Sequence, residues 1–289
     1  MRLANPIYDV VFKYLMEDTE LARRLLGRII GEEIVDLVVR PQEYSAPSEK
    51  HGVTIYRLDF KATIKLKSKP QKKGKEKKNW KPEYKTVLIE LQKAKHRDDL
   101  MRFRRYLGDN YRKKDEVTGA DGKMTAVELP IITVYFLGFP MPPIETSVLK
   151  INRVYTDLIT NKVLDVQTEF IEKLTHDCFV ILIPELPPKE RSGLEKVLKV
   201  FNQTYSLSSD NKLLEISNEE LTGDDLLELL ADRLRKAATD EDILRGIEIE
   251  EEVEDTIDQF IRDNEELKEE NTELKKRLEE LEKQVKNKR

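Results

Sequence analysis

The chain has 289 residues, of which 39% are hydrophobic and 37% are charged, and its formal net charge at pH 7 is −5. Charged residues make up only about a quarter of an average globular protein, so part of this chain is expected to be solvated helix rather than core. A single cysteine, Cys178, excludes an internal disulfide framework and favours a cytoplasmic protein, and the lack of a long apolar run argues against a membrane-spanning helix.

The charge is unevenly distributed along the chain. Residues 215–258 contain 17 acidic and 4 basic side chains, a net charge of −13, so the rest of the chain carries +8. A protein that is acidic as a whole can therefore present a basic surface to a partner.

The N-terminal region predicts two helices and a strand. Asn5 and Pro6 are typical of a helix start, and apolar residues follow them at helical spacing. Asp9 and Lys13 are four residues apart and would lie side by side on this helix, where a surface ion pair is the simplest role. A second helix is expected to stop at Gly31, followed by a strand over residues 34–39 and a loop over residues 41–52.

Two later segments predict neighbouring strands with unusual polar residues. In residues 53–66, Asp59 faces away from an apolar row, and in residues 85–92, Glu90 and Gln92 do the same. If the strands pair, one face packs into a core while the other holds two carboxylates beside an amide. Oxygen ligands on rigid strands suit Mg²⁺ or Mn²⁺. Acids on strands usually face water, so this pattern alone is a weak indication.

A basic insert separates these two strands. Residues 67–82 are crowded with lysines around one aromatic residue and predict a loop or hairpin tip that does not pack. Its role is either solubility or phosphate binding, in which Trp80 could stack on a base. The insert residues expected to bind nucleic acid are Lys72, Lys73, Lys75, Lys77, Lys78 and Trp80.

A basic helix is expected over residues 97–114. An apolar stripe on it faces the core, and arginines and lysines occupy most of the remainder. Because it directly follows the Glu90 strand, the helix is well placed to contact a nucleic-acid backbone through Arg97, Arg102, Arg104 and Arg105. A turn at residues 119–122 and a strand over residues 130–137 come next, then short strands over 149–155 and 179–183 and a helix through residues 194–201.

Together these segments resemble the transposase-like branch of the PD-(D/E)XK nuclease superfamily, the recombination-promoting nucleases. The resemblance is carried by residues 5–13, 56–60, 88–94, 101–107 and 130–136. It implies an α/β fold with a restriction-endonuclease-like αβββαβ core over residues 1–140, including the lysine-rich insert. Residues 141–205 are expected to extend that core as an α/β region.

The resemblance further implies metal-dependent cleavage of a DNA phosphodiester, in recombination or mobile-element defence. Asp59 and Glu90, with the backbone carbonyl of Leu91, would hold Mg²⁺ or Mn²⁺. The motif normally continues with a lysine, and here it has Gln92, which can hydrogen-bond to water but supplies no positive charge.

Three interpretations of this substitution remain open. In the first, Gln92 is sufficient, because the transposase-like branch also uses glutamine at this position. Alternatively, Lys61 or Lys13 supplies the missing charge, with Asp9 as an accessory acid. The third interpretation is a catalytically inactive, dimeric DNA-binding or adaptor protein.

The C-terminal region predicts an acidic helical linker over residues 206–255 and a coiled coil over residues 256–289. Apolar residues and two asparagines follow an uninterrupted heptad, and residues at its flanks have complementary charges. This pattern favours a parallel homodimer over a single helix that packs on the body or is disordered in isolation. The residues expected at the dimer interface are Phe260, Asn264, Leu267, Asn271, Leu274, Leu278 and Leu281.

Overall fold

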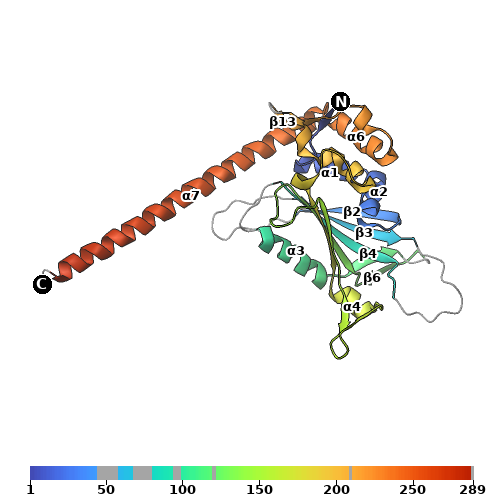
Figure 1. Cartoon of the computed structure of the whole chain (residues 1–289), viewed down its shortest axis with the longest axis horizontal. Helices are drawn as coiled ribbons and strands as arrows, with labels where there is room; N and C mark the ends of the chain where they lie inside the picture. Colours follow the sequence, from blue (N-terminus) through green and yellow to red (C-terminus); the bar gives the residue numbers. More distant parts are fainter. Residues whose placement is uncertain (44–57, 68–79, 94–98, 119–121, 208–209, 288–289) are drawn as a thin grey trace.

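A computed structural model describes residues 1–43, 58–67, 80–93, 99–118, 122–207 and 210–287. Within these ranges the chain is a mixed α/β protein with a mixed six-stranded sheet and seven α-helices, the last of which is long (Figure 1). None of the described helices carries an apolar stretch sufficient to span a bilayer.

The six-stranded sheet has the strand order β2–β3–β4–β7–β11–β8. Its strands are β2 (Ile34–Glu43), β3 (Leu58–Leu66), β4 (Tyr84–Gln92), β7 (Ile131–Leu137), β8 (Val148–Ile151) and β11 (Asp177–Leu182). The pairs β2–β3 and β3–β4 are antiparallel, whereas β4–β7 and β7–β11 are parallel. A parallel pair needs a crossover, and here the crossover contains α3 (Asp99–Arg112) and the hairpin of β5 (Asp115–Thr118) and β6 (Met124–Val127).

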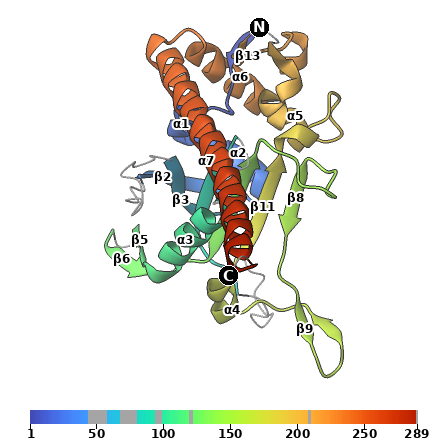
Figure 2. The ribbon, with the colours of Figure 1, turned by 90° about the vertical axis from the view of Figure 1, so that its left-hand side faces the viewer.

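Helices cover both faces of this sheet (Figures 1 and 2). On one face lie α1 (Asp9–Glu17) and α2 (Thr19–Ile30), with α6 (Asp225–Ala237) packed against them. Phe12 of α1 meets the rings of Phe60 and Phe136 edge-on, at centroid distances of 5.7 and 5.2 Å, in the centre of the main core. The opposite face is covered by α3, where Phe103 packs on Tyr135 with ring centroids 5.2 Å apart.

Most of the elements expected from the sequence are present, but α1 begins three residues later than expected. Its N-cap is Tyr8, and the buried Asn5 instead accepts from the backbone N–H of Ile7 at 3.2 Å. The side-chain oxygens of Glu250 accept from the backbone N–H groups of Asp9 and Val10, which have no partner within α1. A residue from a distant helix thus replaces the cap that the sequence suggested.

Two other expectations were wrong in part. Residues 206–255, expected to be helical, begin with β12 (Ser206–Leu207) and β13 (Asp210–Glu215), which form a small sheet with β1 (Arg2–Ala4). Residues 149–155 are not one strand, because the chain leaves the sheet near Arg153, whose guanidinium pairs with Glu172 and Asp177. The remaining short elements are β9 (Tyr155–Asp157), β10 (Lys162–Leu164), α4 (Glu169–Leu174), α5 (Gly193–Leu198) and the 3₁₀ turns Ile183–Glu185, Lys199–Phe201, Gln203–Tyr205 and Glu219–Leu221.

The last helix, α7 (Glu241–Asn287), docks on the body by its first turns only. Ile243 and Ile247 are buried, and Gly246 lies so close to α1 that a Cβ there would be 2.9 Å from Val10 Cγ2. Further along, α7 leaves the body and projects away from it (Figure 1). The linker and the expected coiled coil are therefore one continuous helix from Glu241 onward.

Candidate functional site

The paired strands β3 and β4 have two chemically different faces. Their register pairs Phe60 with Ile89 and Lys61 with Leu88, and directly opposed residues share a face. Phe60 and Ile89 are buried in the main core, so Lys61 and Leu88 lie on the face toward α3. Continued by one step, the same register sets Glu90 opposite the backbone of Asp59 on this polar face.

The structure describes the backbone of Asp59, which pairs with Gln42 of β2, while its side chain lies outside the described residues. Leu91 follows Glu90 with its side chain turned into the core at 8% exposure. The metal-binding roles expected of Asp59 and of the Leu91 carbonyl therefore stay predictions. Among the side chains that the structure describes, which do not include that of Asp59, no three from Asp, Glu, His or Cys gather closely enough to hold a metal ion.

The carboxylate of Glu90 and the amide of Gln92 meet at one cation. Both residues are buried, at 6% and 4% exposure, and they share a face of β4. Arg102, in the first turn of α3, places Nη2 at 2.5 Å from Glu90 Oε1 and donates from the same nitrogen to Gln92 Oε1. Only 18% of the Arg102 side chain and 7% of the Glu90 side chain remain exposed. Two oxygen acceptors thus converge on a single nitrogen of the guanidinium.

Lys61, on the same face, belongs to a second ion pair. Its ammonium lies 2.5 Å from Asp115 Oδ1, and the other carboxylate oxygen of Asp115 accepts a hydrogen bond from the Thr86 hydroxyl at 2.7 Å. Lys61 and Asp115 are both 8% exposed. The positive charge of Lys61 is therefore balanced by a buried carboxylate.

Asp9 and Lys13 lie on α1, which packs on the opposite face of the sheet from Glu90. Asp9 starts the helix, and its backbone N–H donates to Glu250 Oε1 of α7 at 3.1 Å. Lys13 is half-buried one turn further along. The structure thus sets Asp9 beside the long C-terminal helix, and an accessory role for either residue stays a prediction.

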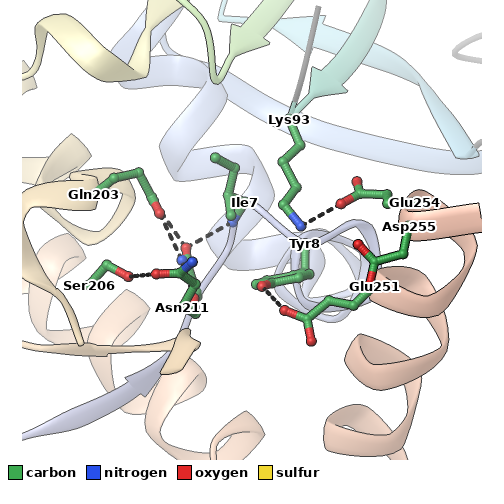
Figure 3. A pocket seen from close by; sticks show the side chains of 10 residues that line it. Ile7, Tyr8, Lys93, Gln203, Ser206, Asn211, Glu251, Glu254 and Asp255 are labelled. Atoms are coloured by element: carbon green, nitrogen blue, oxygen red, sulfur yellow. Dashed lines mark hydrogen bonds and ion pairs between the residues drawn. The ribbon is translucent and has the colours of Figure 1, made fainter. Parts of the chain in front are cut away.

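A polar cavity of about 610 Å³ opens where α1, α7 and the end of β4 meet (Figure 3). Lys93, the residue after β4, points into this region away from Glu90, as strand alternation predicts. Its ammonium contacts Glu254 at 2.7 Å and lies 3.9 Å from the centre of the Tyr8 ring. The Tyr8 hydroxyl donates to Glu251 Oε1 at 2.5 Å. The cavity lining includes Asn5, Ile7, Gln203, Ser206, Asn211 and Asp255 as well.

Glu250, where α7 meets α1, has a pKa that is unusual for a glutamate. Burial, reinforced by the nearby Asp9 carboxylate, raises the pKa of Glu250 to about 8, although hydrogen bonding from Asp9 and the charge of Lys93 act in the opposite direction. Burial and the Glu251 carboxylate also raise the pKa of Tyr8, which stays a phenol at neutral pH. The contact between α1 and α7 therefore contains a carboxyl group that gains or loses its proton near physiological pH.

The structure describes only some of the residues that are expected to contact nucleic acid. Arg104 and Arg105 are exposed on α3, two and three residues after Arg102. Trp80 is half-buried, and its backbone N–H donates to the Gln167 carbonyl at 3.0 Å. Five insert lysines and one arginine lie outside the described residues: Lys72, Lys73, Lys75, Lys77, Lys78 and Arg97.

The residues expected at a dimer interface form an uncovered stripe along α7. The apolar members are 54–61% exposed, and they are Phe260, Leu267, Leu274, Leu278 and Leu281. Asn264 and Asn271 lie in the same stripe, where their amides donate to the carbonyls of Phe260 and Leu267 one turn earlier.

Sequence reasoning missed three contributions to these sites. Arg102 was expected to bind nucleic acid, and its contacts with Glu90 and Gln92 depend on how α3 crosses back over the sheet. Asp115 and Glu250 follow no motif, because each reaches its partner only through tertiary packing. Comparisons of the chain with known protein families, with curated proteins and with solved structures found no match.

Proposed function

We propose that the protein is a Mg²⁺- or Mn²⁺-dependent DNA endonuclease whose site is built on β3 and β4. The observation that carries this proposal is the convergence of Glu90 and Gln92 on one guanidinium nitrogen. A pair of oxygen ligands that already meets at a cationic nitrogen is suited to a metal ion. The proposal assigns the second carboxylate to Asp59, as the alternation of the sequence around it predicts.

The strand arrangement supports the proposal independently of these contacts. Two helices, α1 and α2, precede three antiparallel strands, and the chain then crosses through α3 and the β5–β6 hairpin to β7, which is parallel to β4. With α1 and α2 taken as one helical unit and the β5–β6 hairpin as an insertion, this order supports the αβββαβ core that the resemblance to PD-(D/E)XK nucleases implies. Fold alone does not determine function, so the polar residues on β3 and β4 carry the chemical argument.

In this proposal Asp59 and Glu90 hold the metal ion and Gln92 positions the attacking water. A bound Mg²⁺ or Mn²⁺ would lower the pKa of a water molecule and neutralise charge on the scissile phosphate. The water oxygen forms a new bond to phosphorus, one phosphorus–oxygen ester bond breaks, and the leaving oxygen takes up a proton in exchange for the one lost by water. Lys61 is paired with Asp115, so the proposal does not assign to it the positive charge that the motif lysine would supply.

DNA is the proposed substrate because the helix that covers this face carries exposed basic side chains. Arg104 and Arg105 extend outward from the helix that covers Glu90, and the lysine-rich insert joins β3 to β4. Contacts of this kind position a phosphate backbone without reading its sequence. The single free cysteine, Cys178, fits a cytoplasmic location.

The test is incubation of supercoiled plasmid and single-stranded DNA with Mg²⁺ or Mn²⁺. Cleavage by the wild-type protein should be abolished in Asp59→Ala and Glu90→Gln and by excess EDTA. Glu116→Gln, at an exposed position on β5, is the matched control and should cleave like the wild type. Equal cleavage by all four proteins would mean that a contaminant is responsible and would discard the assignment.

We also propose that α7 forms a parallel homodimeric coiled coil. The apolar stripe on α7 is exposed. A helix that packs against nothing is only marginally stable in water, and a partner helix that covers the stripe would stabilise it. Light scattering should show a dimer for the full chain and a monomer for Leu267→Asp combined with Leu274→Asp. A dimer that persists in the double variant would refute this interface.

A second candidate is a DNA-binding dimer without catalysis. It is favoured by the ion pair of Arg102 with Glu90, which satisfies the buried carboxylate without any metal. Calorimetric titration with Mn²⁺ separates the two, since a protein of the second kind should show no binding that requires Glu90.

A further inference from the structure

We infer that Arg102 is an exchangeable counter-cation. It neutralises Glu90 when no metal is bound, and it moves to the DNA phosphate when a divalent cation takes its place beside Glu90 and Gln92. The inference rests on the proposed function. It assigns Arg102 a role beyond that of a general nucleic-acid contact, because Arg102 would control access to the site and supply the charge that Gln92 lacks.

The first argument is electrostatic. Glu90 is 6% exposed, and a buried carboxylate without a positive partner is costly, so some cation must occupy the space beside it. Arg102 provides that charge, and the nitrogen it uses also binds Gln92. The guanidinium nitrogen of Arg102 fills the space between Glu90 Oε1 and Gln92 Oε1, which is where a metal ion bound by both side chains would lie. Because the nitrogen and a metal ion cannot occupy that space together, Arg102 and the metal compete.

The second argument is that Arg102 is attached where it can move. It lies in the first turn of α3, beside Leu100 and Met101, which are 66% and 50% exposed. The packing of α3 against the sheet begins at Phe103, which contacts Tyr135. Arg102 can therefore change partners by rotating its side chain or loosening one helical turn, without disturbing the core.

The third argument is chemical complementarity. A guanidinium that binds a carboxylate has the fork of donors that suits a phosphate equally well. Once displaced from Glu90, Arg102 would stay close to the bound metal, on the helix that also presents Arg104 and Arg105 to the solvent. A positive charge then reaches the phosphate only after the metal is in place. This order would limit cleavage by the metal-free protein.

The decisive experiment is calorimetric titration of Mn²⁺ into the full-length wild type, Arg102→Ala and Arg112→Ala. Competition predicts that Arg102→Ala binds Mn²⁺ more tightly than the wild type, by on the order of tenfold, because the metal no longer displaces an internal cation. It should nevertheless cleave DNA more slowly than the wild type. Arg112→Ala, whose side chain is 83% exposed on the last turn of α3, should match the wild type in Mn²⁺ affinity.

A measurement on the wild-type chain covers the case in which Arg102→Ala does not fold. Arginine side-chain NMR signals report whether a guanidinium is held in a rigid ion pair, and Arg102→Lys identifies the signal of Arg102. Addition of Mg²⁺ should shift this signal and should speed the rotation of the Arg102 guanidinium group. An unchanged signal in the presence of bound Mg²⁺ would overturn the inference.

The possible failures are distinguishable. If neither the wild type nor Arg102→Ala binds Mn²⁺, the proposed function fails and the exchange fails with it. If both bind Mn²⁺ equally, and Glu90→Gln does not, the metal site stands and the competition by Arg102 is wrong. Weaker binding by Arg102→Ala would show that Arg102 supports the metal site rather than competing for it.

Discussion

Replacement of Glu250 by glutamine should remove a pH dependence of stability that originates where α7 docks on α1. The Glu250 carboxylate accepts from the backbone N–H of Asp9 at 3.1 Å, and burial raises its pKa from 4.5 to about 8. Glutamine keeps an oxygen acceptor for the same N–H group but has no proton to lose. The comparison therefore isolates ionisation from hydrogen bonding.

The direction of this pH dependence follows from how tightly the folded and unfolded chains bind the proton of Glu250. A carboxyl group with a higher pKa in the folded chain binds its proton more tightly there, so its contribution is complete below pH 4.5 and is lost as the pH rises to about 8. At about 1.4 kcal/mol for each pH unit, the full loss is about 5 kcal/mol. Water that enters the junction would relieve part of it, so this value is an upper bound. Burial is the main cause of the raised pKa; the charges of Asp9 and Glu254 add to it, and the charge of Lys93 opposes it.

Urea unfolding at a fixed protein concentration provides the assay. Between pH 5.5 and 8.5 the wild type should lose up to about 3 kcal/mol more of its unfolding free energy than Glu250→Gln. Glu252→Gln changes an exposed carboxylate on the same helix and should follow the wild type. Parallel pH profiles for the wild type and Glu250→Gln would refute the reasoning.

Three further predictions concern the packing around the site. Gly138→Ala would put a Cβ 2.3 Å from the Lys93 carbonyl oxygen, so the chain after β4 must shift, and thermal unfolding should show a loss of about 1–3 kcal/mol. Asp115→Ala leaves the ammonium of Lys61 buried without its carboxylate and should cost about 3–5 kcal/mol in urea unfolding, with partial recovery in Lys61→Met combined with Asp115→Ala. Phe12→Ala empties the centre of the aromatic cluster and should cost about 3–5 kcal/mol by calorimetry, whereas a loss below about 1 kcal/mol would mean that Phe12 is not central.

Local patterns in the sequence predicted most of the fold. Alternation in the segments around Phe60 and Ile89 identified two strands and assigned their apolar residues to the core face. Helical spacing identified α2 and its end at Gly31, where a positive φ of 75° suits glycine. Both signals depend only on residues a few positions apart, so they can be recognised without knowing the tertiary structure.

The candidate site was only partly predictable for the same reason. Glu90 and Gln92 were assigned to one face of one strand, because that needs only the two-residue repeat of a strand. The partners of that face come from elsewhere: Arg102 from a crossover helix and Asp115 from the hairpin after it. Neither position carries a local signal for its partner.

The sequence by itself determined which residues share a face of a strand or a stripe of a helix, including the apolar stripe of α7. Only the tertiary structure decided which cation faces Glu90, which carboxylate balances Lys61, and that Glu250 caps a helix some 240 residues away. The physical reason is that periodicity is set by the local geometry of the backbone. The pairing of buried charges depends instead on which distant segments exclude water from one another.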